Sequence, residues 1–107
     1  MKNKVVVITG GSSGIGFALA ERFGRSGSKV LITGRNAIEL NKAAEVLQAK
    51  GLTVAAFRAD VSKEEDNKAM AGEAIRLYGT IDILINNAGI SMRALFTEVD
   101  MDVVKSV

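Results

Sequence analysis

The chain has 107 residues, enough for a single domain with one hydrophobic core, and its composition excludes several kinds of active site. It contains no cysteine and no histidine, which excludes disulfides, thiolate nucleophiles, imidazole bases and the common zinc sites, and with them a Ser-His-Asp hydrolase. Fourteen basic and twelve acidic residues leave a net charge of +2 that is scattered along the sequence, which favours a solvated surface over nucleic-acid binding.

Four short runs rich in β-branched residues predict strands at 5–9, 30–33, 53–57 and 81–85. Polar residues do not alternate with the apolar ones in these runs, so we expect strands that are buried on both faces, as in a parallel sheet.

The segments between the strands carry apolar residues at helical spacing, and each predicts a helix with one stripe facing inward. In chain order, the three stripes are Ile15, Leu19 and Phe23; Leu40, Ala43, Ala44 and Leu47; and Met70, Ala74, Leu77 and Tyr78.

Residues at the predicted helix ends agree with this division. Gly27, Gly51 and Gly79 each follow a helical pattern, where a left-handed cap conformation costs glycine almost nothing. Ser62 and Glu65 have the spacing of a capping box that opens the third helix. A fourth helix is predicted from Asp100 onward. The alternation of strands and helices predicts a single α/β domain with a parallel sheet, right-handed crossovers and helices on both faces.

A glycine-rich loop, Thr9-Gly10-Gly11-Ser12-Ser13-Gly14-Ile15-Gly16, joins the first strand to the first helix. Such a turn lets the backbone approach a ligand closely, and the N–H groups and dipole at the helix start favour a phosphate. We therefore expect a pyrophosphate over Gly14 to Gly16. Phe17 follows the last glycine where a Walker A loop needs lysine, and Leu19 stands where the G-x-G-x-x-G fingerprint needs glycine or alanine.

The loop resembles the cofactor loop of the short-chain dehydrogenase/reductase family, Thr-Gly-x-x-x-Gly-[Ile/Leu]-Gly, at every fixed position. Two further signatures of that family follow in order: Asp60-Val61 after the third predicted strand, and Asn86-Asn87-Ala88-Gly89 after the fourth. The resemblance implies a Rossmann-like, three-layer half-sheet of four parallel strands in the order 3-2-1-4. It covers all 107 residues, which correspond only to the cofactor-binding first half of such an enzyme, so the domain is expected to be incomplete at its C-terminus.

The second predicted strand is followed by Arg35 and Asn36. About twenty residues beyond the loop, dinucleotide folds place an acid for the ribose 2′-hydroxyl of NAD or an arginine for a 2′-phosphate. Arg35 lies nineteen residues after Gly16 and no acid is nearby. We therefore expect NADP(H) to be preferred over NAD(H); the alternative is a solvated arginine at a helix start.

The resemblance also implies roles for the other signature residues. It assigns the side chain of Asp60 to the adenine amino group, the backbone of Val61 to the neighbouring ring edge, and residues 87–89 to the floor beneath the nicotinamide-side ribose. Asn86 or Asn87 ties adjacent strand ends together, and for Asn86 a purely structural role is as well supported as a ligand role. The candidate cofactor-binding residues are Gly10, Ser12, Ser13, Gly14, Ile15, Gly16, Arg35, Asn36, Asp60, Val61, Asn87, Ala88 and Gly89.

Catalytic residues cannot be assigned. In the resembled family a Tyr-x-x-x-Lys pair and a serine carry out the proton transfer that accompanies hydride transfer, but the only tyrosine, Tyr78, has Asp82 four residues later. We therefore interpret the chain as the NADP(H)-binding portion of an oxidoreductase acting on an alcohol or carbonyl substrate. The alternative is a non-catalytic NADP(H)-binding or assembly module.

Apolar segments bear on location and assembly. The runs at 5–8 and 83–85 are far too short to span a bilayer, no secretion leader stands at the N-terminus, and the lack of cysteine fits a reducing compartment. We expect a cytoplasmic protein without a membrane partner. An apolar edge at 83–85 would be exposed unless residues 92–107 cover it, which favours a homodimer or larger assembly.

Overall fold

A computed structural model describes residues 2–12 and 14–87 of the chain. The described elements are β1 (Val5–Thr9), α1 (Gly14–Arg25), β2 (Lys29–Gly34), α2 (Ala37–Ala49), β3 (Val54–Arg58), α3 (Glu64–Tyr78) and β4 (Ile83–Asn86). The four strands form one parallel sheet in the order β3-β2-β1-β4, which confirms the predicted α/β fold and strand order. The helix predicted from Asp100 onward lies outside the described residues.

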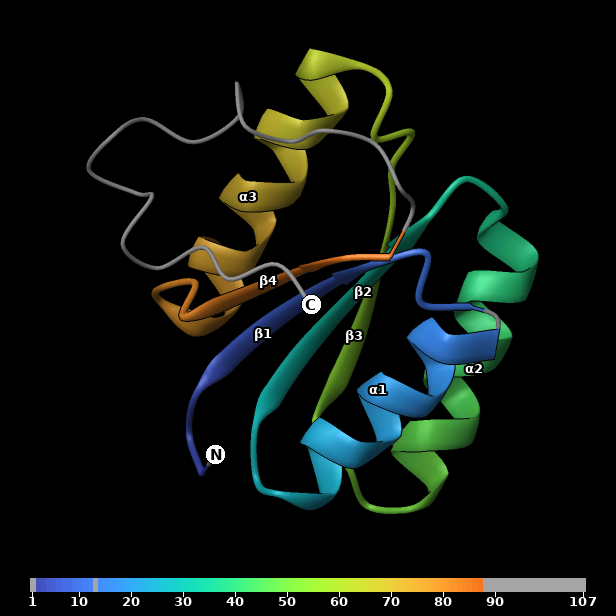
Figure 1. Ribbon diagram of the computed structural model, residues 1–107, viewed down its shortest axis with the longest axis vertical. Helices are drawn as coiled ribbons and strands as arrows, with labels where there is room; N and C mark the ends of the chain where they lie inside the picture. The colour runs from blue at the N-terminus through green and yellow to red at the C-terminus, as the bar shows by residue number, and fades with distance from the viewer. Residues whose placement is uncertain (1, 13, 88–107) are drawn as a thin grey trace.

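The helices form a layer on each face of the sheet (Figure 1). On one face α1 packs against β1 and β2, and α2 against β2 and β3; on the other, α3 packs against β1 and β2. Successive β1 side chains alternate between two cores, with Val6 and Ile8 on the α1 and α2 side and Val7 on the α3 side. Because both faces are covered, all of β1 is buried, as the continuous apolar run predicted.

The carboxyl ends of the strands are aligned at one edge of the sheet. Thr9 at the end of β1 is in register with Thr33 of β2 and Asn86 of β4, and Thr33 is in register with Phe57 of β3. The loops that follow these residues therefore start side by side. In open parallel sheets this edge is where ligands bind.

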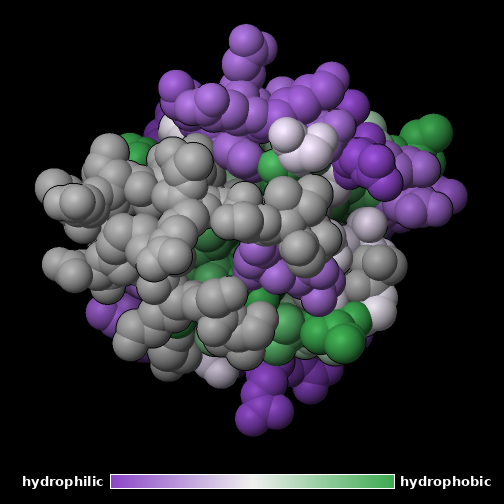
Figure 2. Space-filling view, turned by 45° about the horizontal axis from the view of Figure 1, so that its top comes forward, coloured by the Kyte–Doolittle hydropathy of each residue, from purple (hydrophilic) through white to green (hydrophobic). Residues whose placement is uncertain are grey.

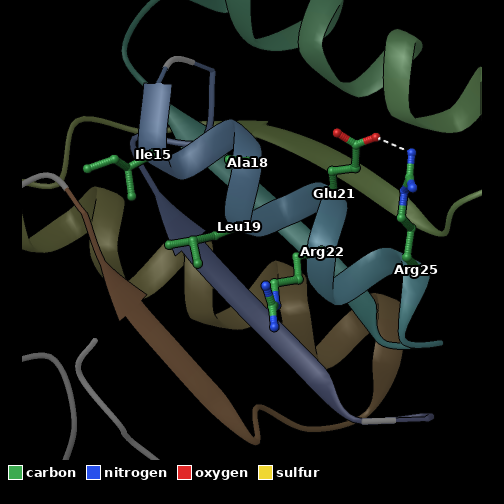
Figure 3. Close-up of a pocket in the computed structure, with 6 residues that line it drawn as sticks. All are labelled: Ile15, Ala18, Leu19, Glu21, Arg22 and Arg25. Carbon is green, nitrogen blue, oxygen red and sulfur yellow. Dashed lines mark hydrogen bonds and ion pairs between the residues drawn. The ribbon is translucent and has the colours of Figure 1, made fainter.

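The buried stripe of α1 differs from the predicted one. Gly16, Ala20 and Gly24 are the buried residues of this helix, whereas Ile15 is 70% exposed. Figure 3 shows the Ile15 side chain pointing away from α1, and Ile15 and Leu19 both line a shallow groove along this helix. The prediction is wrong for Ile15 because three small residues, four apart, let the helix backbone lie close to the sheet.

Leu19 and Phe23 are half-buried and pack against the core from the sides of α1. In α2 all four predicted residues are buried. In α3 Met70 and Ala74 are buried and Tyr78 is half-buried, but Leu77 is 39% exposed and that part of the prediction is wrong. Asn67 extends the buried stripe instead, because it lies one turn before Met70 on the same helix face.

The helix ends follow the predicted glycines but not the predicted capping box. Gly27, Gly51 and Gly79 have φ angles of 90°, 83° and 88°, as a left-handed cap requires. The N-cap of α3 is Lys63, which makes no side-chain capping bond. Ser62 instead donates to the carboxylate of Asp60, and this local bond takes the place of the capping box.

An acidic side chain braces α1 against the end of α2. Glu21 accepts from Lys50 Nζ at 2.7 Å and from Arg25 Nη2 at 2.8 Å, the second bond being drawn in Figure 3. The hydrogen bond from Lys50 holds the pKa of the Glu21 carboxyl below its ordinary value, and Arg25 acts in the same direction.

In the coloured part of Figure 2, small hydrophobic patches lie among hydrophilic surface. In β4, at the edge of the described sheet, Leu84 and Ile85 are buried and Ile83 is half-buried. Residues 92–107, the segment expected to cover this edge if no second copy does, lie outside the described residues. The expected assembly of several copies stays a prediction. None of the described helices is long and apolar enough to cross a membrane.

Substitution of Ala20 by leucine tests the buried stripe of α1. Ala20 is fully buried between α1 and the sheet, so we expect the larger side chain to lower the free energy of unfolding by about 1–3 kcal/mol. Ala18 is exposed on the same helix, and Ala18→Leu should change the free energy of unfolding by less than about 0.5 kcal/mol. Urea denaturation of both variants and of the wild type measures these changes. Equal effects would contradict the assigned inner face.

Candidate functional site

The glycine loop lies directly on the end of β2. The N–H groups of Gly10 and Gly11 both donate to the Thr33 carbonyl oxygen, at 2.8 and 3.1 Å. A Cβ on Gly11 would come within 2.5 Å of the Ile32 Cβ, so this turn has no room for a side chain. The loop is thereby fixed at the carboxyl edge of the sheet.

The start of α1 is pressed against the same loop. A Cβ on Gly16 would collide with the carbonyl oxygen of Gly10, and it would lie 2.8 Å from Nδ2 of Asn87. That Nδ2 atom donates to the Gly10 carbonyl at 3.2 Å. Three segments therefore meet at one point: the loop after β1, the first turn of α1 and the residue after β4.

The N-terminus of α1 fits an anionic group. Gly14 has a φ of 49°, which favours glycine, and no atom lies within 4 Å of the position a Cβ would take there. The first turn of α1 contains no acidic residue, whereas the first turn of α3 contains three and that of α2 contains Glu39. No carboxylate of this first turn thus opposes its N–H groups or the positive end of the helix dipole. A pyrophosphate suits this position, and the space above Gly14 could admit it.

The predicted loop residues divide into three groups. Gly10, Gly14 and Gly16 are placed as described above, and Ile15 contributes its backbone in the first turn of α1 while its side chain is exposed. The Ser12 hydroxyl lies beside Gly34, since a Cβ on that glycine would be 3.8 Å from Ser12 Oγ. Ser13 lies outside the described residues.

Arg35 and Asn36 follow β2 at the predicted place. Arg35 is exposed, and its carbonyl oxygen accepts a hydrogen bond of 3.2 Å from Nε of Arg58. The Asn36 side chain caps α2, with Oδ1 accepting from the N–H of Glu39 at 3.1 Å. The Arg35 side chain therefore extends from a short junction between β2 and α2. The Arg35 carbonyl and the Asn36 side chain in this junction both make hydrogen bonds.

Asp60 is held as an ionised acceptor beside this junction. Its Oδ1 accepts from Ser62 Oγ at 2.6 Å and from the Ser62 N–H at 3.0 Å. The Ser62 hydroxyl, then the Ser62 amide, lower the pKa of the Asp60 carboxyl, and the positive charge of Arg35 lowers it further. Val61 is buried in the core beneath α3. A carboxylate in this position can accept from an exocyclic amino group such as that of adenine.

The two asparagines at the end of β4, Asn86 in the strand and Asn87 just after it, bind neighbouring segments. Oδ1 of Asn86 accepts from the Thr9 hydroxyl at 3.3 Å, and Asn87 binds the Gly10 carbonyl as described. The structure thus supports the strand-tying role for both side chains. Ala88 and Gly89, predicted to lie beneath a ribose, are outside the described residues.

Tyr78 serves the core and not the site. Its hydroxyl donates to the Val30 carbonyl at 3.2 Å, and Val30 stands near the start of β2, at the opposite end of the sheet from the glycine loop. Burial raises the pKa of the Tyr78 hydroxyl. A proton donor for a ligand at the carboxyl edge must therefore come from another residue.

Two residues missed by the sequence analysis connect the predicted ones. Arg58 binds the Arg35 carbonyl and pairs with Asp66 at 3.6 Å, and Asp66 accepts from the Asp60 N–H at 2.8 Å. No motif marks Arg58 or Asp66; the available signal is the position of Arg58 directly after the strand predicted at 53–57. Within 2–12 and 14–87, no group of three or more acidic, histidine or cysteine residues could hold a metal ion.

Comparison with known proteins identifies the family. A family model described as short chain dehydrogenase matches residues 4–107. The chain belongs to this family. The human protein named dehydrogenase/reductase SDR family member 4 is 36% identical over 91 residues, which are 85% of this chain and 33% of that protein. The chain thus spans about a third of the length of the family relatives it matches.

Solved structures of the family share this fold and include dinucleotide complexes. The actinorhodin polyketide ketoreductase structure with NADPH has a TM-score of 0.78 at 30% identity, covering 94% of this chain and 40% of the other. A Burkholderia phymatum short-chain dehydrogenase/reductase in complex with NAD has a TM-score of 0.77 at 33% identity, covering 78% of this chain and 30% of the other. The described region of the chain is the cofactor-binding region of the family.

Substitution of Gly16 by alanine tests the contact that fixes the loop. The added methyl group collides with the Gly10 carbonyl, so we expect the free energy of unfolding to fall by about 1–3 kcal/mol. Gly72 is a matched helical control because no atom lies within 4 Å of its Cβ position; Gly72→Ala should raise stability by about 0.5–1 kcal/mol. Chemical denaturation measures both. A Gly16→Ala variant as stable as wild type would show that the loop is not packed in this way.

Proposed function

We propose that this chain is the NADP(H)-binding portion of an oxidoreductase that transfers hydride between the cofactor and an alcohol or carbonyl substrate. The observation that carries the choice of NADP(H) is the end of β2, where Gly34 is followed by the exposed Arg35 and no acidic residue stands between β2 and α2. Family membership supports binding of a dinucleotide. Because relatives were crystallised with NADPH and with NAD, the preference between the two depends on this chain's own residues.

The chain's residues divide the work of binding. The N–H groups of the first turn of α1 would hold the pyrophosphate, and the Asp60 carboxylate would accept from the adenine amino group. Arg35 would bind the 2′-phosphate by charge-assisted hydrogen bonds, which contribute about 1.5–3 kcal/mol. The bound cofactor supplies the hydride; the chain positions and selects it.

Substitution of Arg35 by aspartate tests the phosphate preference. The carboxylate would repel a 2′-phosphate, so we expect NADPH affinity to fall about ten- to a hundredfold and the preference for NADPH over NADH to narrow or invert. Arg76→Asp makes the same charge change in the last turn of α3 and should leave the preference unchanged. Fluorescence titration of each variant with NADPH and with NADH measures the two affinities. A preference that is unchanged in Arg35→Asp would refute the assignment.

Turnover by this chain alone is not expected. The only tyrosine is half-buried at the far end of the sheet and donates to the Val30 carbonyl, which also favours the alternative of a non-catalytic binding module for these residues by themselves. NADPH absorbance should therefore stay constant when a carbonyl substrate is added to residues 1–107. Steady oxidation of NADPH would show that the catalytic groups are on this chain.

A further inference from the structure

A bridge of two charged side chains connects the two sides of the proposed adenosine site. Arg58 is the last residue of β3 and is in register with Gly34, the last residue of β2. From the end of β3, its Nε–H donates to the carbonyl oxygen of Arg35, which directly follows the neighbouring strand β2, at 3.2 Å. The bond therefore holds the backbone of Arg35, the residue whose side chain is proposed to bind the 2′-phosphate.

Asp66 completes the bridge from the first turn of α3. Its Oδ2 lies 3.6 Å from Nη1 of Arg58 and also accepts from the N–H of Asp60 at 2.8 Å. The backbone of Arg35 and the backbone of Asp60 are thus joined through Arg58 and Asp66. A shift of either backbone would break at least one of these contacts.

The junction at Arg35 needs such support because it is short and exposed. On one side Gly34 is anchored by its carbonyl, which accepts from the Ala59 N–H at 3.0 Å; on the other, Asn36 begins α2. The Arg35 carbonyl between them is bound by Arg58. Fixing the backbone reduces the number of positions that the long Arg35 side chain samples, which lowers the entropy lost when it binds a ligand.

Charge also favours a partner for Arg58 in this place. The carboxylate of Asp66, 3.6 Å from Nη1, offsets the positive charge of Arg58. Among the residues that the structure describes, Nε alone of the Arg58 nitrogens makes a hydrogen bond. Arg58 thus contacts the Arg35 backbone through Nε and pairs with Asp66 through Nη1.

We propose that Arg58 is a positioning residue for cofactor selectivity: held by Asp66, it fixes the Arg35 backbone so that the Arg35 guanidinium meets the 2′-phosphate. This inference rests on the proposed NADP(H) function. A positioning role differs measurably from a role as a second phosphate ligand. A positioning residue affects NADPH affinity only while Arg35 is present. A direct ligand would act with or without Arg35.

A double-mutant cycle with the full chain tests this distinction. The variants are Arg58→Met, Arg35→Ala and the pair together, with dissociation constants for NADPH and NADH measured by isothermal titration calorimetry. Arg58→Met should weaken NADPH binding about three- to tenfold and NADH binding less than about twofold. In the Arg35→Ala background, Arg58→Met should have no further effect on NADPH.

Two further variants separate positioning from charge and from folding. Arg58→Lys keeps the charge and one donor that can reach the carbonyl, so it should recover most of the NADPH preference. Arg76→Met removes one positive charge from an ion pair with Glu73 in the last turn of α3 and should not change the ratio of the two affinities. Circular dichroism melting of each variant accompanies the titrations. A fold defect lowers both affinities together and leaves their ratio unchanged.

The possible results are distinguishable. If Arg35→Ala leaves the ratio of NADPH to NADH affinity unchanged, the proposed phosphate contact is wrong and the role of Arg58 is wrong with it. If Arg35→Ala lowers the ratio but Arg58→Met does not, only the positioning role is overturned. If Arg58→Met weakens NADPH binding equally in both backgrounds, Arg58 acts on the phosphate directly and the proposal is also overturned.

Discussion

The contact between the first turn of α1 and the Gly10 carbonyl is the constraint on which the rest of the site depends. Gly16 must lack a side chain for this contact, and Asn87 binds the same carbonyl from the end of β4. The start of a helix, a strand-to-helix loop and a neighbouring strand end are thereby held at one point. Because this point is at the carboxyl edge of the sheet, the free N–H groups of α1 are directed toward the place where ligands of such sheets bind.

The same close approach explains the inner face of α1. Gly16, Ala20 and Gly24 follow one another at intervals of one turn, and their small size lets the helix lie near β1 and β2, whose own side chains fill the core. Ile15 is left outside for the same reason. On the opposite face, Met70 and Ala74 pack α3 against the sheet, and Tyr78 ends that layer far from the loop. The fold thus places the proposed binding groups at one edge of the sheet and the tyrosine at the other.

The strands, their order and the inner face of α2 could be predicted because each depends on a local pattern: a continuous apolar run, a family signature or a 3.6-residue period. Ile15 and Leu77 were misplaced because spacing alone does not tell which of two adjacent helix faces meets the sheet, and small residues were given no weight. Ser62 failed as a cap because Asp60 competes for its hydroxyl. The link from Arg58 to Arg35 depends on the register of β2 and β3, which no local pattern reveals.

We propose that the carboxyl edge of this sheet, with the N-terminus of α1 at its centre, binds a dinucleotide through residues from three successive loops. The most direct measurement is the change in backbone amide NMR shifts when NADPH is added to ¹⁵N-labelled chain. We expect the largest changes at Gly14, Gly16, Arg35 and Asp60, and little change around Tyr78 and Gly27 at the other end of the sheet. Saturable changes centred on that other end, or none anywhere, would contradict the account.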